Sequence, residues 1–181
     1  HLNDAQIAGL TTDQVKALTT SAVTALKADQ VSKFSTTQVS VVTAANVTAL
    51  NSDQVAALTT AQIGALGTDQ VKAITTTALA AMQTNQVAAL NTAQVAALTT
   101  SQMAALTANE VKTLSTTQVQ ALGSTQVNAL TNANVSAMTT TQVAALTVGQ
   151  VTGLTSSAVS ALGTAQVKAL STAQVQAITT A

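Results

Sequence analysis

Few side chains in this 181-residue sequence could take part in acid–base, nucleophilic or metal chemistry. His1 is the only histidine, cysteine is absent, and the six acidic residues are dispersed along the chain. Catalysis needs unlike groups that converge, such as a nucleophile, a base and a group that orients them. An N-terminal histidine can chelate copper through its amine and ring, but no further ligands stand near His1. We therefore expect no catalytic, cofactor-binding or metal-ligating residue, and we expect that the protein is not an enzyme.

The acidic residues and the glycines do not match a known ligand motif either. Five aspartates lie in the first half of the chain: Asp4, Asp13, Asp29, Asp53 and Asp69. They lack the density of glycine and aspartate that calcium-binding repeats show, so a solvated surface is the better interpretation. Gly67, Gly123 and Gly163 each open a repeat, where glycine serves at a helix end and not in a phosphate-binding loop.

The elements that must carry these residues are short repeats. Residues 3–178 form 22 consecutive octads of the type TTxQVxAL, without insertion or deletion. A strict short period indicates that one small unit stacks on copies of itself, so that order comes from contacts between neighbours. We expect one repeat array over residues 1–181, as a part of a longer array or filament.

Each octad has the pattern of a capped helix. Position one is Thr, Ser, Asn or Gly in twenty of the 22 octads, and position four is mostly Gln. These types at this spacing predict a capping box, in which each side chain bonds the backbone N–H of the other residue. Four pairs that fit are Thr11 and Gln14, Thr59 and Gln62, Thr107 and Glu110, and Ser171 and Gln174. We expect a helix over positions two to eight, with positions five and eight buried and positions three and six in water.

Two other folds compete with this interpretation. A continuous helix would turn about 800° per octad, so its apolar stripe would drift by about 80° each time. A β-solenoid is favoured by the many Val and Thr residues, but positions five and eight would then point to opposite faces. We predict an all-α solenoid (superhelix) of very short capped helices, one per octad, with a β-solenoid as the alternative.

A longer period overlies the octads. The chain divides into three blocks of seven octads, residues 11–66, 67–122 and 123–178. The second octad of each block lacks the glutamine and has Ala22, Ala78 or Asn134 instead, and the fifth octad lacks it at Asn46 and Ala158. This spacing of three and then four octads predicts a superhelix with about 3.5 octads, or about 28 residues, per turn, and with the exceptional octads along one side. Duplication of a gene segment explains the same pattern without a structural cause.

Composition excludes several kinds of partner. Six basic and six acidic residues give no net charge and no basic cluster, so we expect no nucleic-acid binding. Thr and Gln interrupt every octad, so we expect no membrane span. Lys33, Phe34, Val41 and Val42 make residues 27–42 atypical. They form either a contact patch or, more simply, a local variation of the core.

The ends and the threonines suggest how the array is used. Leu2 stands at position eight of a preceding octad, and residues 179–181 begin another, so neither end has a capping sequence of its own. We expect that the chain associates with itself, end to end or laterally. The alternative is a module that binds ice or glycans through aligned threonine rows. One such row is Thr60, Thr68, Thr76, Thr84, Thr92 and Thr100.

The octads, in forms such as LNTAQVAALTTSQMAAL and LSTAQVQAI, resemble the L-[ST]-x-x-Q-V-x-A-L tandem arrays of large bacterial surface or secreted proteins of adhesin-like or exoprotein-like type. The similarity covers nearly the whole chain, although residues 27–42 depart from the pattern. It implies an extracellular or cell-surface location, a structural, non-enzymatic role as a stalk, a fibre or a matrix component, and the cell surface or matrix as a partner. It supplies no functional residue.

Overall fold

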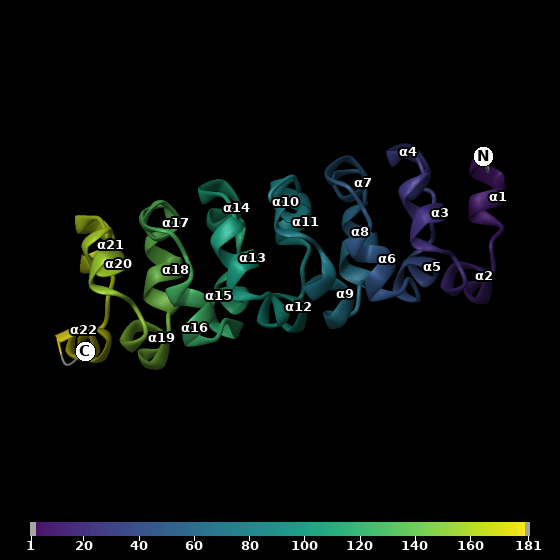
Figure 1. The fold of residues 1–181 in the computed structure, drawn as a ribbon. Helices are drawn as coiled ribbons and strands as arrows, with labels where there is room; N and C mark the ends of the chain where they lie inside the picture. The colour runs from purple at the N-terminus through teal and green to yellow at the C-terminus, as the bar shows by residue number, and fades with distance from the viewer. Residues whose placement is uncertain (1–2, 180–181) are drawn as a thin grey trace. The chain divides into compact units, whose positions relative to one another are not determined.

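The computed structural model describes residues 3–179. The predictions that concern His1, Leu2 and residues 180–181 therefore lie outside the described residues. The chain forms two compact units, His1–Ala97 and Leu98–Ala181. Both units consist of short helices joined by tight connections (Figure 1). Residues 3–179 contain no strand, so the β-solenoid alternative is not supported.

The first unit holds twelve helices within its described residues. They are α1 (Asp4–Ala8), α2 (Thr12–Lys16), α3 (Thr20–Thr24), α4 (Ala28–Val31), α5 (Thr36–Ser40), α6 (Ala44–Thr48), α7 (Ser52–Ala56), α8 (Thr60–Ala65), α9 (Thr68–Ala73), α10 (Thr76–Leu79), α11 (Thr84–Ala88) and α12 (Thr92–Ala97).

The second unit holds ten helices within its described residues. They are α13 (Thr100–Ala105), α14 (Ala108–Thr113), α15 (Thr116–Ala121), α16 (Ser124–Asn128), α17 (Asn132–Ala137), α18 (Thr140–Ala145), α19 (Val148–Thr152), α20 (Ser156–Ser160), α21 (Thr164–Lys168) and α22 (Thr172–Thr179). The prediction of one short helix per octad is thus confirmed in both units.

The capping boxes that the sequence predicts are present. In α8, the backbone N–H of Thr59 donates to Oε1 of Gln62 at 2.7 Å, and the backbone N–H of Gln62 donates to the Thr59 hydroxyl at 3.2 Å. The same reciprocal pair occurs at the other three predicted sites. These bonds satisfy backbone N–H groups that a helix start leaves without partners, which lets a very short helix begin at every octad.

The helices end earlier than the sequence suggests. Most end at position six or seven of the octad, as α2 and α9 do, whereas we expected position eight. Leu66, which occupies position eight after α8, has extended dihedral angles of φ −63° and ψ 140°. The next octad begins at an N-cap residue, which must itself be extended. Position eight therefore leaves the helix to lead into that cap.

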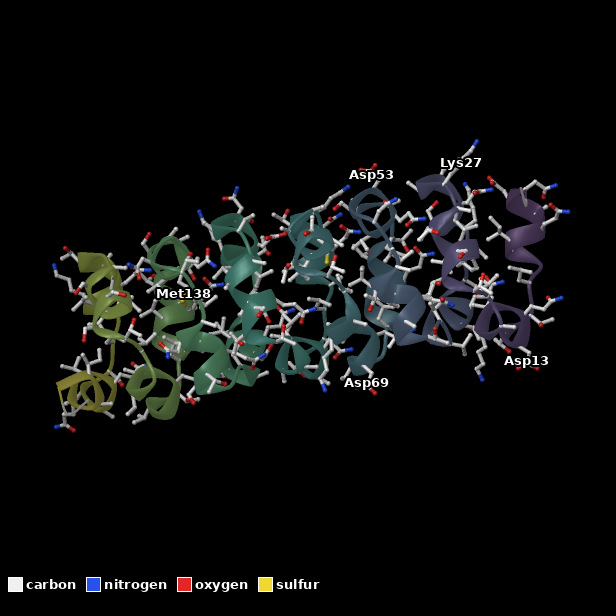
Figure 2. All side chains as sticks on the ribbon, in the orientation of Figure 1. Asp13, Lys27, Asp53, Asp69 and Met138 are labelled. Atoms are coloured by element: carbon white, nitrogen blue, oxygen red, sulfur yellow. The ribbon has the colours of Figure 1, made fainter. Side chains whose placement is uncertain are left out.

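The core of each unit is built from positions five and eight. Ile63 and Val71 are fully buried in the first unit, and Met103 and Val143 in the second. The leucines of position eight from Leu58 to Leu146 are nearly as well covered. Charged residues of position three lie at the outside of the helices, as Asp53 and Asp69 do in Figure 2. The expected division into buried and solvated positions is thus confirmed.

Helices of successive turns pack against one another within each unit. In the first unit α5 packs against α8 and α6 against α9, while in the second α14 packs against α17 and α19 against α22. Every such pair is separated by three octads. Side-chain bonds also reach four octads back, from Gln54 to the carbonyl groups of Val23 and Leu26. Contacts at three and at four octads together give the predicted turn of 3.5 octads.

Candidate functional site

The feature that distinguishes this array is a layer of buried glutamines at position four. Fourteen of these glutamines are buried, although glutamine is usually exposed in folded proteins. They begin at Gln30, and the glutamines of the first two octads, Gln6 and Gln14, are exposed. A buried amide must find hydrogen-bond partners for both its oxygen and its nitrogen, because an unpaired polar group in the core is costly.

The oxygen of each amide serves the helix to which it belongs. Oε1 of Gln54 accepts the backbone N–H of Asn51 at 2.9 Å, and Oε1 of Gln94 accepts that of Asn91 at 2.7 Å. The capping residue can be glycine without loss of this bond, because only its backbone N–H is used. Gly67 donates to Oε1 of Gln70 at 2.6 Å in this way.

The nitrogen of the same amide serves an earlier turn. Nε2 of Gln94 donates to the carbonyl oxygens of Ile63 and Leu66 at 2.8 and 2.7 Å. Nε2 of Gln142 donates to those of Val111 and Leu114 at the same two distances. In both cases the acceptors stand 31 and 28 residues before the donor, so the bond repeats with the turn. We call this pair of bonds the glutamine bridge.

The glutamine bridge solves two problems of a very short helix. A helix leaves carbonyl groups without partners at its last turn, just as it leaves N–H groups without partners at its first. One glutamine caps the start of its own helix and the end of a helix four octads earlier. Each buried hydrogen bond contributes about 1 kcal/mol, and leaving a buried carbonyl unpaired costs about 1–3 kcal/mol. The bridges therefore hold successive turns together and set their register.

The exceptional octads change the bridge in a graded way. Asn46 has a shorter side chain and donates only to the carbonyl oxygen of Leu18, at 2.8 Å, and Asn134 likewise donates only to that of Leu106, at 3.0 Å. Alanine cannot donate at all, and Ala78 is buried without a bridge. These octads alternate between spacings of three and four octads. With a turn of 3.5 octads, those within one unit therefore lie along one side, as the sequence predicts.

Glu110 is the one acidic residue at position four. Its Oε2 accepts the backbone N–H of Thr107 at 2.6 Å, so it keeps the capping box. Its side chain is almost fully buried. Burial raises the pKa of this carboxyl, while the backbone N–H and the hydroxyl of Thr107 act in the opposite direction. The other oxygen, Oε1, is buried and is the only such side-chain atom in the described chain without a hydrogen-bond partner.

The other charged side chains lie at the surface and form no convergent set. Lys33 pairs with Asp4 across 3.8 Å, and Lys72 pairs with Asp69 across 3.7 Å. Within residues 3–179, no group of three or more His, Cys, Asp or Glu side chains is placed to hold a metal ion. The three glycines that open repeats stand at N-cap positions, where Gly123 and Gly163 donate their N–H groups to the glutamine three residues later.

The atypical stretch 27–42 belongs to the core of the first unit. The ring of Phe34 is buried and lines an apolar cavity of about 40 Å³ together with Val39 and Val42. The carbonyl of Phe34 accepts a bridge from Gln62 at 2.6 Å, and that of Val42 accepts one from Gln70. The bridges thus continue through this stretch, and the simpler of the two interpretations, a local variation of the core, describes Phe34 correctly.

The threonine row of position two is exposed but does not form one face. Thr60, Thr68 and Thr92 are the first residues of the helices α8, α9 and α12 of the first unit. A turn of 3.5 octads points neighbouring octads in different directions, and a given position returns to nearly the same side only after three or four octads. Ser52, also at position two, lies beside position three of a later octad, with its hydroxyl 3.4 Å from the carbonyl oxygen of Thr77. Ice or glycan binding stays a prediction from the sequence.

Comparison with known proteins identifies the repeat. The model of the ALTTAQ repeat family matches the chain at residues 31–68, 45–76, 71–108, 100–132, 109–140 and 149–180. These overlapping matches tile well over half of the sequence, which confirms a tandem repeat array. A search of curated proteins finds no match. Among the described residues, no helix has the length and apolar character needed to span a bilayer.

Proposed function

The chain belongs to the ALTTAQ repeat family, and we propose that it is a structural, non-enzymatic component of an extracellular filament or surface stalk. In this proposal the octads stack within the chain, and copies of the chain associate end to end through the same contact. The observation that carries the proposal is the direction of the glutamine bridge. Each bridge donates from a later turn to an earlier one, so the two ends of a stack offer different and complementary groups.

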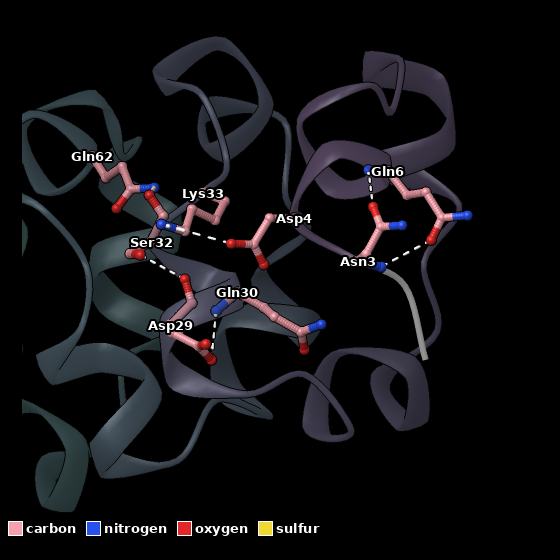
Figure 3. Close-up of polar contacts among 8 residues, drawn as sticks. All are labelled: Asn3, Asp4, Gln6, Asp29, Gln30, Ser32, Lys33 and Gln62. Atoms are coloured by element: carbon pink, nitrogen blue, oxygen red, sulfur yellow. Dashed lines mark hydrogen bonds and ion pairs between the residues drawn. The ribbon is translucent and has the colours of Figure 1, made fainter.

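The first turn offers free donors. Gln6 and Gln14 use Oε1 for their own capping boxes, at 2.8 Å from the N–H groups of Asn3 and Thr11. Their Nε2 atoms have no hydrogen-bond partner among residues 3–179, and both side chains are exposed. Figure 3 shows the reciprocal pair of Asn3 and Gln6, with the amide nitrogen of Gln6 turned away from the neighbouring helices.

The last turn offers the matching surface. Val167 and Val175 occupy position five, which is buried in the other octads except that of Val159, where it is half-buried, yet they are 47% and 42% exposed. A hollow of about 570 Å³ is lined by four apolar and four hydroxyl side chains: Val151, Leu154, Val159, Ile178, Thr152, Thr155, Ser156 and Ser160. No glutamine of this chain stands at the bridging distance after Leu154, so its carbonyl group receives no bridge from within the described residues. A face with exposed valines, hydroxyl side chains and unbridged carbonyl groups fits another turn of the same repeat.

The register of such a contact follows from the octads. Suppose that, after Ile178 of the previous copy, the octad of Asn3 in the next copy replaces the octad that residues 179–181 begin in the sequence. Gln6 of the second copy then stands where a bridge to the carbonyl of Leu154 would begin, and Gln14 stands where a bridge to Leu162 would begin. Both donors therefore meet a carbonyl at position eight, as the bridges within the chain do. A contact of this kind is heterologous and open, so it adds copies without limit and produces filaments.

The extracellular setting and the adhesin-like role are supported by the resemblance to bacterial surface and secreted arrays. The absence of net charge supports lateral association of the filaments, because neutral surfaces do not repel one another. The alternative, an ice-binding or glycan-binding module, has no separate support from the geometry of the threonine row.

The full chain tests the proposal by sedimentation velocity and negative-stain electron microscopy. We expect filaments whose length grows with protein concentration. Replacing Val167 and Val175 by Asp places charges in the contact and should abolish the filaments while the helical circular dichroism is kept. Val148→Asp is the matched control, because Val148 is 48% exposed but stands at position two, outside the contact. Discrete short particles of the unaltered chain at all concentrations would overturn the proposal, and thermal hysteresis from those particles would favour ice binding.

The donor face is tested by Gln6→Ala combined with Gln14→Ala. Loss of both Nε2 donors should weaken end-to-end association. It removes no bridge from the single chain, because neither amide nitrogen is bonded among the described residues. Gln120→Ala is the control, since the Gln120 side chain is exposed at position six. Equal association of the double variant and the control would show that copies join through another surface.

A further inference from the structure

Glu110 differs from every other residue at position four of the octads. Sixteen of the 22 octads have Gln at position four, and Glu110 is the only residue there that can ionise. The capping box treats the two residue types alike, because both accept the N–H of the cap residue. Thr107 accordingly donates to Oε2 of Glu110 at 2.6 Å, much as Thr139 donates to Oε1 of Gln142 at 2.8 Å. The difference between glutamate and glutamine concerns only the second atom of the head group.

That second atom is a donor in glutamine and an acceptor in a carboxylate. In α18, Nε2 of Gln142 donates to the carbonyl oxygens of Val111 and Leu114. The corresponding atom of Glu110 is Oε1, which is buried and has no hydrogen-bond partner in the described chain. The bridge layer is made of backbone carbonyl groups, which are acceptors. An ionised carboxylate cannot bond to them, whereas a protonated carboxyl can donate its O–H.

Within the described part of the second unit, no charged side chain stabilises the ionised form of Glu110. The helix α17 packs against α14 and contains no titratable residue. Lys112 is on the same helix as Glu110, but it is exposed and two residues away, so the two side chains do not face each other. The only other charged residue of the second unit is Lys168, in α21. Burial accordingly raises the pKa of Glu110.

We propose that Glu110 is a proton-operated position in the second unit. At low pH its carboxyl is protonated, so its head group can donate a hydrogen bond as the glutamine amide does. At higher pH the carboxyl releases its proton to solvent, and the ionised group is left buried, with no donor to Oε1 among the described residues. The octad of Glu110 then loosens, while the octads that have glutamine keep their bridges.

The direction of the pH dependence follows from the raised pKa of Glu110 in the folded chain. A group that holds its proton more tightly in the folded chain than in the unfolded chain stabilises the fold at low pH. That stabilisation is lost as the pH rises through the pKa of the folded state. An ordinary exposed carboxylate contributes little to such a change, because its affinity for a proton differs little between the two states.

Thermal unfolding of the full chain, followed by circular dichroism between pH 4 and pH 8, tests this proposal. We expect the Tm to fall by roughly 3 °C across this range, which is the shift that one lost buried hydrogen bond gives in a chain of this size. Glu110→Gln restores the residue that the other octads use, so this variant should fold. It should show a constant Tm, above that of the unaltered chain at pH 8.

Asp53→Asn is the matched control, because it removes one exposed carboxylate and should keep the fall in Tm. Infrared spectroscopy gives a second readout: a carbonyl stretch of a buried protonated carboxyl should be present at low pH and absent in Glu110→Gln. The proposal is overturned if Glu110→Gln keeps half or more of the fall in Tm, or if the unaltered chain shows no fall.

Discussion

The amide nitrogen of Gln54 lies 2.7 Å from the carbonyl oxygen of Leu26, a residue 28 positions earlier in the chain. The oxygen of the same amide lies 2.9 Å from the backbone nitrogen of Asn51. One side chain thus connects the start of α7 to the chain just after α3. Glutamate has nearly the same shape as glutamine, so the two halves of this connection can be separated by a single substitution.

Gln54→Glu should keep the capping box and lose the bridge. At neutral pH the new carboxylate faces two carbonyl oxygens that had been 2.7 and 2.9 Å from a donor. We expect a loss of about 3 kcal/mol in the free energy of unfolding, because a buried charge is left without a partner. Urea titration at pH 7 measures this loss. Gln120→Glu, at an exposed glutamine, is the control, and equal midpoints for the two variants would show that the bridge does not stabilise the array.

Thr59→Ala should destabilise the first unit by about 1 kcal/mol, the usual effect of removing an N-cap side chain. The hydroxyl of Thr59 accepts the backbone N–H of Gln62 at 3.2 Å. The adjacent Thr60 is exposed and stands at the first helical position, so Thr60→Ala should change the stability very little. Denaturant unfolding of both variants tests the assignment of the cap, which is contradicted if Thr60→Ala has the larger effect.

A fragment of three octads, residues 51–74, should not fold by itself. It is shorter than the stretch of chain that one bridge spans, so it contains no glutamine bridge and no contact between turns. Helices as short as these are not stable in water without such contacts, because nucleation is unfavourable. Circular dichroism of the synthetic peptide in plain buffer should show a disordered chain. A cooperative thermal transition would contradict the view that order depends on neighbouring turns.

End-to-end association of the full chain should depend little on salt. The two proposed contact faces are made of amide, carbonyl and apolar groups, and the chain has no net charge. Added salt screens charged contacts but has little effect on neutral ones. Between about 50 and about 500 mM NaCl we expect the association constant to stay within about twofold. A tenfold loss would instead locate the contact at the charged positions three and six.

Much of this fold follows from the octad alone. The types at positions one and four predict the caps, and the apolar pair at positions five and eight predicts the core. The exceptional residues Ala22, Asn46 and Ala78 predict the turn of 3.5 octads, which the bridge of Gln54 then shows. The early end of each helix was not predicted, because the extended conformation of Leu66 is required by the cap that follows and not by its own side chain.

The second role of the glutamines was also missed. A capping box explains glutamine at position four completely, so the sequence suggested no need for a further partner. A signal was nevertheless present, because glutamate serves a capping box equally well, yet it occurs once against sixteen glutamines. That imbalance indicates that the amide nitrogen has a use of its own. The sequence contains no comparable signal for the division into two compact units, because the octads continue unchanged past Ala97.

The fractional turn restricts how such an array can be lengthened by gene duplication. A whole number of octads and a whole number of turns coincide first at seven octads, which make two turns. Copying a single octad would keep the bridges, whose acceptors are backbone carbonyl groups of every octad, but would take the alanine and asparagine octads off their common side. Copying seven octads keeps that side. The seven-octad blocks of this chain are therefore the shortest segments whose duplication restores the same orientation, so a history of duplication and a geometric requirement become one explanation.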